Sequence, residues 1–381
     1  MEPLEIRVDD LLLRSWRPTD APAIVRARAD AAISRWSNSS PVPYLQEHAH
    51  EFLARVVDGA GNPRAARSAI TDAESGELLG SVALHSIDRE ARTGELSYWT
   101  APWARGRRVA ERAARPLLSW GFATLGLARV DWHAVVGNHA SRLIGLRLGF
   151  RMIGTVPGEL RRRDDSRVDE WFGCLLPGEL TAAGFEVPDP VRRAALVFGH
   201  DQPVLAEGAV RLRRPLGRDE PGIAAAYQDP ASVRWFGGPQ PYTRAHAARY
   251  VDDHVPAEWA RGVEAIFAVV DESDAYAGSI DLRISPTDPA VGEIGCLIAP
   301  RARGRGHAPA ALRALSRWGF DELGLGRIEW RAEVGNSASR RVAEKAGFTF
   351  EGVQRAGLLR GGTRRDMWVC ARTATDAAAQ R

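Results

Sequence analysis

Hydrophobic and polar positions along the second half of the chain follow strand and helix periods in turn. Residues 209–213 alternate between apolar and polar side chains, which favours a half-buried strand. Further strands are predicted at residues 265–270, 276–284, 293–298, 327–333, 348–354 and 365–371, and helices at residues 218–228, 243–259, 309–323 and 338–346. Strands followed by a strand–loop–helix–strand–helix–strand succession predict an α/β fold with helices on one mixed sheet, an α+β arrangement around a single core.

Three residues mark helix ends within this pattern. Thr243 is expected to cap the helix at residues 243–259, because a threonine side chain accepts a hydrogen bond from the first turn. Pro309 is tolerated in the first turn of the next helix. Gly347 is expected to follow the last helix in the left-handed conformation that ends many helices.

The chain repeats itself with an offset of 198 residues. Between Gly80 and Phe150, 32 of 71 positions are identical to their counterparts in the second half. A period this long exceeds that of solenoid repeats, so each copy is expected to be a domain. The sequence therefore predicts an N-terminal domain at residues 1–177, a linker rich in Pro, Gly and acidic residues at 178–205, and a C-terminal domain at 206–381.

Composition excludes several classes of function. The 51 basic and 48 acidic residues leave a net charge of +3 without a clustered basic face, so no nucleic-acid partner is expected. Three dispersed cysteines and nine histidines show no metal-ligand spacing, so no metal and no disulfide framework are expected. No stretch reaches the ~20 apolar residues of a membrane helix, and residues 1–20 lack the pattern of a secretory signal. We therefore expect a cytoplasmic protein without a membrane partner.

Residues 293–315 carry the most informative chemistry of the sequence. A strand ends, a loop of glycines and arginines follows and a helix begins, which directs backbone N–H groups and the positive helix end at one anion. Gly304 and Gly306 let the backbone approach a phosphate, and Arg303 and Arg305 add positive charge. The loop predicts a pyrophosphate site, with a solvated surface loop as the structural alternative. A Walker loop and a dinucleotide fingerprint are excluded, because neither motif is present.

Two motifs in this region resemble those of the GNAT superfamily of N-acetyltransferases. The segment Arg303-Gly304-Arg305-Gly306-His307-Ala308 is similar to its R/Q-x-x-G-x-G/A acyl-CoA loop, and residues 336–348 are similar to its N-x-x-S-x-R-V-x-E-K-x-G-F signature. The second motif is typical of the RimJ/RimL-like branch, which acetylates protein N-termini. The resemblance covers nearly the whole chain, twice, and implies two tandem GNAT folds that use acetyl-CoA as cosubstrate.

The resemblance also implies a direct transfer of the acetyl group to a primary amine, without a covalent acyl-enzyme. Glu293 would then remove a proton from the amine, Ser339 would reprotonate the departing thiolate, and backbone N–H groups near Leu297 and Ile298 would stabilise the thioester oxygen. The cofactor-binding residues implied are Leu297, Ile298, Arg303, Gly304, Arg305, Gly306, His307, Ala308 and Asn336. Structural roles stay open beside these: a strand-edge salt bridge for Glu293, a helix cap for Ser339 and a turn residue for Asn336.

The first copy departs from this pattern at one position of its loop. Arg108 stands where the second copy has Gly306, although Glu95, Asn138 and Ser141 are kept. A side chain there crowds a pyrophosphate, and each amide–phosphate bond lost would cost ~1.5–3 kcal/mol. Arginine is also a phosphate ligand, so the substitution does not decide the matter by itself. We expect the second copy to be catalytic and the first to be a degenerate partner that shapes the acceptor groove.

The sequence leaves the acceptor open between a protein or peptide N-terminus, an antibiotic-like small molecule and a metabolite amine. A similarity to mycothiol synthase, another tandem GNAT with an active C-terminal copy, gives an alternative enzyme. A non-catalytic acyl-CoA-binding regulatory module is the alternative class, and the presence of both Glu293 and Ser339 speaks against it. A tandem repeat can mimic within one chain the two-fold pair of single-domain relatives, so we expect a monomer, with a homodimer as the alternative.

Overall fold

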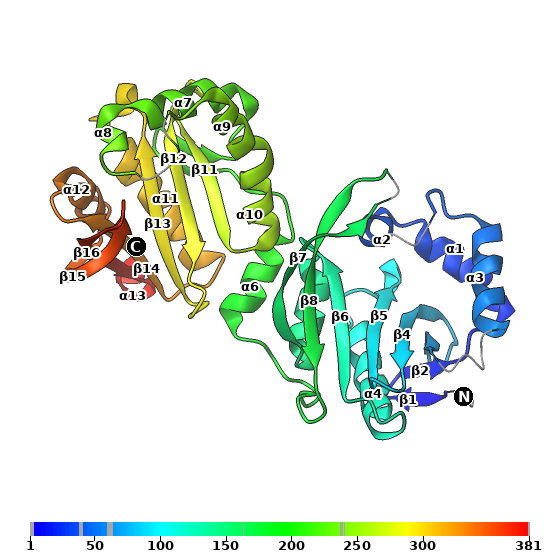
Figure 1. The fold of residues 1–381 in the computed structure, drawn as a ribbon. Helices are drawn as coiled ribbons and strands as arrows, with labels where there is room; N and C mark the ends of the chain where they lie inside the picture. The colour runs from blue at the N-terminus through cyan, green and yellow to red at the C-terminus, as the bar shows by residue number, and fades with distance from the viewer. Residues whose placement is uncertain are drawn as a thin grey trace. The chain divides into compact units, whose positions relative to one another are not determined.

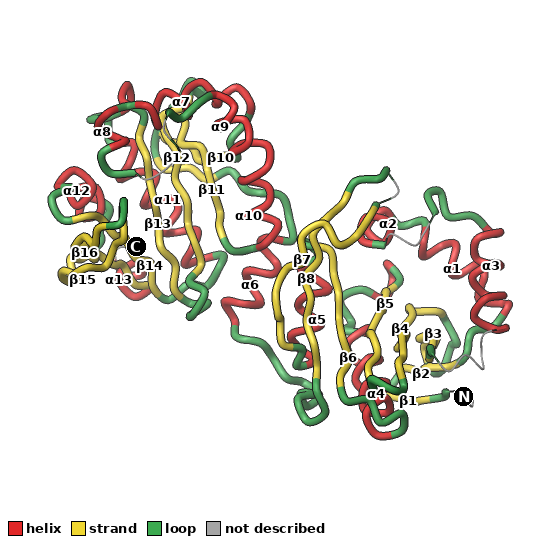
Figure 2. Tube along the Cα trace, viewed as in Figure 1, coloured by secondary structure: helices red, strands yellow, loops and turns green. Residues whose placement is uncertain are grey.

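The computed structural model contains the whole chain and describes residues 4–37, 41–58, 64–162, 164–236, 239 and 241–379. Contacts divide the chain into two units, Met1–Val187 and Pro188–Arg381. Each unit has an eight-stranded mixed sheet with helices packed on it (Figures 1 and 2). The predicted fold class, a mixed sheet with helices in each of two copies, is confirmed.

The sheet of the second unit contains one parallel strand pair near its centre. Its strand order is β15-β16-β14-β13-β12-β11-β10-β9; β13 and β14 pair in parallel, and the other neighbours pair antiparallel. The strands are β9 (Leu205–Glu207), β10 (Val210–Arg213), β11 (Glu264–Val270), β12 (Tyr276–Ile284), β13 (Val291–Ile298), β14 (Arg327–Glu333), β15 (Thr349–Arg360) and β16 (Thr363–Thr373). The closing hairpin β15–β16 is longer than the sequence predicts.

Alternate residues of the strands enter two different cores, because successive side chains of a strand point to opposite faces. On β11, Phe267 and Val269 belong to a core shared with helices α11 and α12, whereas Ala268 and Val270 belong to a core shared with α7, α9 and the turn η4. We call these the α11 face and the α7 face. The helices of this unit are α6 (Asp189–Phe198), α7 (Glu220–Gln228), α8 (Pro230–Val233), α9 (Arg244–Arg249), η4 (Tyr250–His254), α10 (Val255–Arg261), α11 (His307–Asp321), α12 (Ser337–Lys345) and α13 (Ala374–Ala379).

Helix ends in the second unit confirm two sequence signals and correct one helix. Thr243 caps α9 by accepting a hydrogen bond from the backbone N–H three residues later at 3.3 Å. Gly347 follows α12 with a φ of 85°. The single helix expected at residues 243–259 is instead α9, the π-helical turn η4 and α10. Pro256 accounts for the irregularity, because it lacks an N–H group and its ring clashes with the carbonyl four residues earlier.

The interval 178–205, predicted as a linker, contains helix α6 and is shared between the two units. Phe198, at the end of α6, is buried in the core of the α11 face. At the other end of the interval, the Thr181 N–H donates to the Leu148 carbonyl of the first unit at 3.3 Å. The sequence signal of Pro, Gly and acidic residues therefore marks turns on both sides of a packed helix.

The first unit repeats the topology of the second. Its strand order is β1-β2-β3-β4-β5-β6-β8-β7, with β5 and β6 parallel. Its strands are β1 (Ile6–Val8), β2 (Leu11–Arg14), β3 (Ala66–Asp72), β4 (Leu78–Asp88), β5 (Thr93–Thr100), β6 (Arg129–Val135), β7 (Arg151–Arg161) and β8 (Arg167–Leu175); its helices are α1 (Ala21–Arg28), α2 (Ala31–Trp36), α3 (Gln46–Asp58), α4 (Val109–Ala123) and α5 (His139–Leu148). Within the described part of the chain, no helix is both long and apolar enough to cross a membrane.

Candidate active site

The parallel strands at the centre of the second unit separate after a short pairing. β13 pairs with β14 over Val291–Glu293 and then continues along β12 without β14. Parallel strands end at the same edge of a sheet, so the segments that follow them, 299–306 and 334–336, border this opening. The opening is therefore flanked by the starts of the two helices α11 and α12, which follow these segments in the chain.

The peptide groups of β13 divide between the neighbouring strand β12 and the opening. The Ala299 N–H donates to the Ala277 carbonyl at 2.9 Å, and the Leu297 carbonyl lies so close to Gly278 that a Cβ there would stand 2.3 Å from it. Because peptide groups alternate in direction along a strand, Leu297 faces β12 and Ile298 faces the opening. Of the two backbone N–H groups expected to donate to a thioester oxygen, only that of Ile298 points toward the opening.

The glycine loop has the geometry that an anion site needs. Gly304 and Gly306 have φ angles of 76° and 80°, in the left-handed region, and no atom lies within 4 Å of the place where their Cβ atoms would be. Gly306 caps α11, so the N–H groups of His307 and Ala308 in the first turn have no partner inside the helix. The loop thus presents backbone donors and the helix dipole to open space.

The two arginines of this loop differ in what they can bind. Arg303 donates to Asp229 Oδ2 at 2.7 Å and to Ser232 Oγ at 2.9 Å, and these contacts fix the loop to α8. The Arg303 guanidinium also holds the pKa of Asp229 below its usual value. In the first unit Arg105 binds Asp30 in the same way at 2.5 Å. Arg303 is therefore engaged in a structural contact, whereas Arg305 is exposed and makes no ion pair within the described residues.

The start of α12 places a hydroxyl beside the opening. Asn336 Oδ1 accepts a hydrogen bond from the Ser339 N–H at 3.2 Å and caps the helix, so its expected role as a turn residue is present. Ser339 Oγ accepts a hydrogen bond from Trp330 Nε1 at 3.0 Å. That bond uses a lone pair of the hydroxyl and leaves its proton free to be donated.

Glu293 lies at the point where β13 and β14 separate, and its carboxylate is shared between two arginines. Arg283 lies 3.1 Å away and Arg331 lies 3.7 Å away. The side chain of Glu293 is 36% exposed. The salt bridge that the sequence left open for Glu293 is thus formed, and a base role would require the carboxylate to leave these partners.

A second carboxyl group near this strand was missed by the sequence analysis. Asp281 lies on β12 directly opposite Gly295 of β13, on the α7 face. Burial raises the pKa of Asp281 to about 7, with Glu264 and Glu293 adding to the shift and Arg283 opposing it. The sequence did contain a signal for it. Asp281 is an acidic residue between the apolar residues Ile280 and Leu282 of an inner strand, and the strand pattern alone gives no reason for a carboxyl group there.

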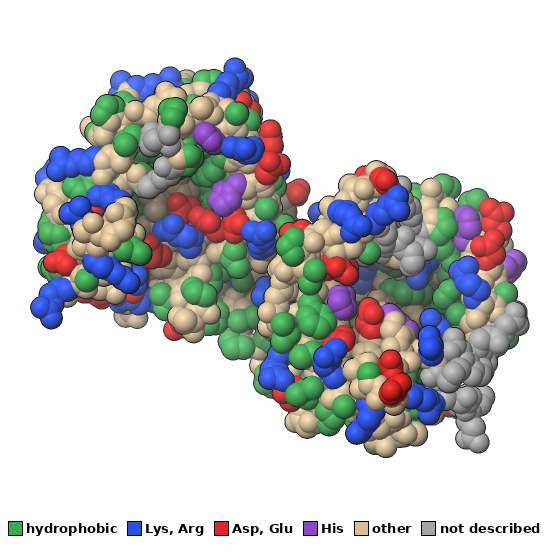
Figure 3. Space-filling view, in the orientation of Figure 1, with side chains coloured by type: hydrophobic (Ala, Val, Ile, Leu, Met, Phe, Trp, Pro, Cys, Tyr) green, Lys and Arg blue, Asp and Glu red, His purple; other side chains and the backbone are tan. Residues whose placement is uncertain are grey.

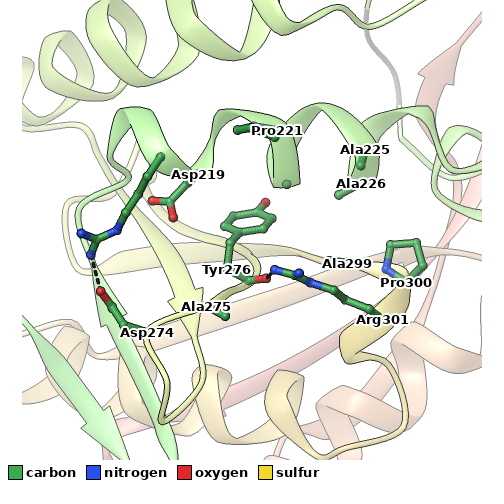
Figure 4. A pocket seen from close by; sticks show the side chains of 12 residues that line it. Asp219, Pro221, Ala225, Ala226, Asp274, Ala275, Tyr276, Ala299, Pro300 and Arg301 are labelled. Carbon is green, nitrogen blue, oxygen red and sulfur yellow. Dashed lines mark hydrogen bonds and ion pairs between the residues drawn. The ribbon is translucent and has the colours of Figure 1, made fainter.

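A pocket of the second unit lies between α7 and the end of β13 (Figure 4). It has a volume of about 590 Å³, and Tyr276 and Arg301 line it from below α7. The Arg301 guanidinium donates to the Tyr276 carbonyl at 2.8 Å. None of the site residues expected from the sequence is among the lining residues of this pocket, which are Arg218, Asp219, Pro221, Gly222, Ala225, Ala226, Asp274, Ala275, Tyr276, Ala299, Pro300 and Arg301.

Two of the three free cysteines, both in the second unit, lack the environment of a nucleophile. Burial raises the pKa of the Cys296 and Cys370 thiols above the usual value, so both stay protonated at neutral pH. This agrees with a transfer that forms no acyl-cysteine. Among the side chains that the structure describes, no group of three or more His, Cys, Asp or Glu residues could hold a metal ion.

The corresponding loop of the first unit ends in an arginine that is paired with two glutamates. Arg108 caps α4 with a φ of 54°, a left-handed conformation that non-glycine residues rarely adopt. Its guanidinium donates to Glu186 and lies 3.9 Å from Glu111 in the first turn of α4. Glu111 is buried and is also 3.6 Å from Arg115. Glu111 thus places a carboxylate in the first turn of α4. The matching residue in α11 of the second unit is Pro309, which carries no charge.

The serine of the first unit is also held differently. Ser141 Oγ is hydrogen-bonded to the Tyr98 hydroxyl at 3.0 Å. Trp132 Nε1 donates to the Tyr98 hydroxyl at 3.1 Å and does not reach the serine directly. In the second unit Cys296 stands at the position of Tyr98, and the tryptophan bonds the serine directly. The two units therefore share the scaffold of the site but differ in its loop and in its serine.

Comparison with known proteins identifies the family of the two units. The family model of the GNAT acetyltransferase domain matches twice, at residues 10–151 and 210–349. The putative ribosomal N-acetyltransferase YdaF of Bacillus subtilis (strain 168) is 39% identical over 75 residues, which cover 20% of this chain and 41% of that protein. The uncharacterized N-acetyltransferase YoaA of the same organism is 26% identical over 153 residues, which cover 40% of this chain and 85% of that protein.

Solved structures of similar proteins each cover about one unit. Mycobacterium smegmatis RimJ in complex with CoA-disulfide is 22% identical with a TM-score of 0.42, and the match covers 47% of this chain and 89% of that one. The ribosomal-protein-S5-alanine acetyltransferase from Vibrio fischeri is 18% identical with a TM-score of 0.42, covering 47% of this chain and all of that one. The two matches of the family model span most of the chain, and the chain therefore belongs to the GNAT acetyltransferase family and carries two copies of its domain.

Proposed function

We propose that the chain is an acetyl-CoA-dependent N-acetyltransferase and that its second unit carries the working site. The observation that supports this most directly is the opening between β13 and β14 with Gly304 and Gly306 at its edge. A thioester arm needs such an opening, and a pyrophosphate needs such unobstructed amides. Membership of the GNAT family supports the reaction class.

The residues of the second unit fit an acyl-CoA molecule. The N–H groups of His307 and Ala308 would hold the pyrophosphate, and Arg305 would add a counter-charge. The Ile298 N–H would donate to the thioester oxygen as negative charge develops there. When bound, acetyl-CoA supplies an activated acetyl group, and the chain itself positions that group and moves the protons.

Two protons have to move during the transfer. The acceptor arrives as an ammonium ion and must lose a proton before its nitrogen can attack. The departing thiolate must gain a proton, and the Ser339 hydroxyl is suited to give it, because Trp330 leaves that proton free. For the first proton the site offers two carboxyl groups, Glu293 and Asp281.

The acceptor that we favour is the N-terminal amine of a peptide or protein, with an antibiotic-like small molecule as the second class. The similarity to YdaF, whose name describes a putative ribosomal N-acetyltransferase, supports the first class. In this proposal the first unit binds no acyl-CoA, because Arg108 replaces the glycine that caps the helix in the second unit and Glu111 adds a carboxylate to the first turn of that helix. We propose a monomer, since the chain already contains a pair of domains.

The test is thiol release from acetyl-CoA with a panel of peptides, aminoglycosides and small amines, comparing the wild type with Gly306→Arg. We expect turnover with at least one amine and its loss in the variant, because the new side chain enters the space above the helix start. Arg108 shows that the fold accepts an arginine in this conformation. If Gly306→Arg keeps full turnover, the working site lies elsewhere; if no amine is acetylated by the wild type, the proposed reaction is wrong.

A further inference from the structure

We propose that Asp281, and not Glu293, accepts the proton of the acceptor ammonium ion in the second unit. This inference rests on the proposed function and names the residue and the charge that its acceptor site uses. In the step, one N–H bond breaks and the proton moves to an Asp281 carboxylate oxygen, while its electron pair stays on nitrogen. That pair then forms the C–N bond as the C–S bond of the thioester breaks. Ser339 gives its hydroxyl proton to the sulfur. The nitrogen then loses its second proton, which restores the Ser339 hydroxyl.

The position of Asp281 on the sheet is the first argument. Asp281 opposes Gly295, whereas Glu293 lies two residues further from Ile298 along β13. At a rise of about 3.3 Å per residue, Asp281 is roughly 7 Å nearer to the end of the strand that faces the opening. A Cβ atom on residue 295 would stand 2.8 Å from Asp281 Oδ1, so a glycine is what allows the carboxyl group to lie over β13.

The free oxygen of Asp281 is the second argument. The side chain of Asp281 is 23% exposed, but its Oδ2 atom is buried and has no hydrogen-bond partner within the described residues. The nearest cation, Arg283 Nε, lies 3.5 Å away, and the hydrogen bond of Arg283 goes to Glu293 instead. An unpartnered buried oxygen costs free energy unless a donor arrives, and an ammonium ion is such a donor.

The surroundings of Asp281 favour a cation. Glu264 lies on the neighbouring strand β11, and burial raises the pKa of Glu264 as well. Tyr227 and Tyr250 lie close enough for the charge of Asp281 to raise the pKa of both hydroxyls further, so both stay protonated and can donate. Figure 3 shows acidic and basic side chains gathered in a hollow of the second unit. Within the described residues, the charged and titratable groups that interact electrostatically with Asp281 are Arg283 on β12, Glu264 on β11, Glu293 and Cys296 on β13, Tyr227 on α7 and Tyr250 in η4.

The chain contains its own comparison. In the first unit Ala83 opposes Ser97 at the register position where Asp281 opposes Gly295. The first unit nevertheless keeps Glu95, the counterpart of Glu293. The first unit, whose loop carries Arg108, thus has no counterpart of Asp281 but has the glutamate, which is what we expect if the aspartate performs the step.

The experiment measures kcat and kcat/KM against pH for the full chain, with the best amine of the panel, in the wild type, Asp281→Asn and Glu293→Gln. We expect Asp281→Asn to lower kcat by about 100-fold or more and to remove the rise of activity through neutral pH, while the calorimetric Kd for acetyl-CoA is unchanged. Glu293→Gln should keep that rise. Asp281→Ala, which the first unit shows to fit this strand position, should be partly rescued by added formate.

The outcomes separate the two proposals. If Asp281→Asn keeps kcat within about threefold and retains the pH dependence, or if Glu293→Gln removes it, the assignment of Asp281 is wrong although the enzyme is an acetyltransferase. If the wild type acetylates no amine, the proposed function fails first. A loss in Asp281→Ala that formate does not rescue, together with a weakened Kd for acetyl-CoA, would indicate a structural role and overturn the assignment.

Discussion

Replacing Asp281 by asparagine should make the protein more stable at alkaline pH, although it removes a group proposed to act in catalysis. Burial raises the pKa of Asp281 from its usual 3.8 to about 7, so the folded state holds this proton more tightly than the unfolded state. The wild type therefore loses stability as the pH rises from about 4 to about 7, because folding must then keep a charge on a side chain that is only 23% exposed. Asparagine has a similar shape and carries no charge at any pH.

The size of the effect follows from the shift of this pKa. A change from 3.8 to about 7 corresponds to roughly 4 kcal/mol at pH 8, where the carboxylate is charged in both states. The gain of Asp281→Asn over the wild type should be close to zero at pH 4 and should approach this value at pH 8. Asparagine also keeps an acceptor for the Gly295 backbone, so little is lost in exchange.

The assay is urea unfolding of the full chain, followed by circular dichroism at several pH values between 4.5 and 8.5. A matched control is Asp271→Asn in the β11–β12 turn, where hydrogen bonds from Ser273 and Ala275 hold the pKa of the carboxyl below its usual value. That variant should be less stable than the wild type at pH 8. A stability difference for Asp281→Asn that is the same at pH 5 and pH 8 would refute the argument that burial of a charge governs this site.

Two further predictions concern the first unit. Asp20→Asn should lower the free energy of unfolding by about 3 kcal/mol in urea denaturation, because Asp20 binds the buried Arg14 guanidinium through both oxygens at 2.8 and 2.9 Å; an unchanged transition midpoint would contradict this. Arg108→Gly should not give the first unit affinity for acetyl-CoA, because the Glu111 carboxylate stays at the start of α4. Calorimetry of the full chain should therefore show one site in both proteins, and a second site in the variant would show that Arg108 alone closes the loop.

Some elements of the fold follow from local sequence. The predicted strand at residues 327–333 coincides with β14, and Thr243 and Gly347 mark their helix ends, because capping and strand alternation depend on neighbours in the chain. The prediction of one regular helix at residues 243–259 was wrong, since Pro256 interrupts the backbone hydrogen bonds of that segment. Helix α6 was missed because turn residues surround it and its packing partner is distant in sequence.

The residues of the candidate site also fall into two groups, those that local motifs identify and those that only tertiary contacts reveal. The sequence by itself determined the duplication, the glycine loop before α11 and the serine and asparagine that begin α12, since each is a local motif. The tertiary structure decided which groups are free to act: Arg303 is bound to Asp229, Glu293 is held by two arginines, and Asp281 faces Gly295 from another strand. Pairing across strands and burial of charge depend on residues far apart in the chain, and no local pattern contains them.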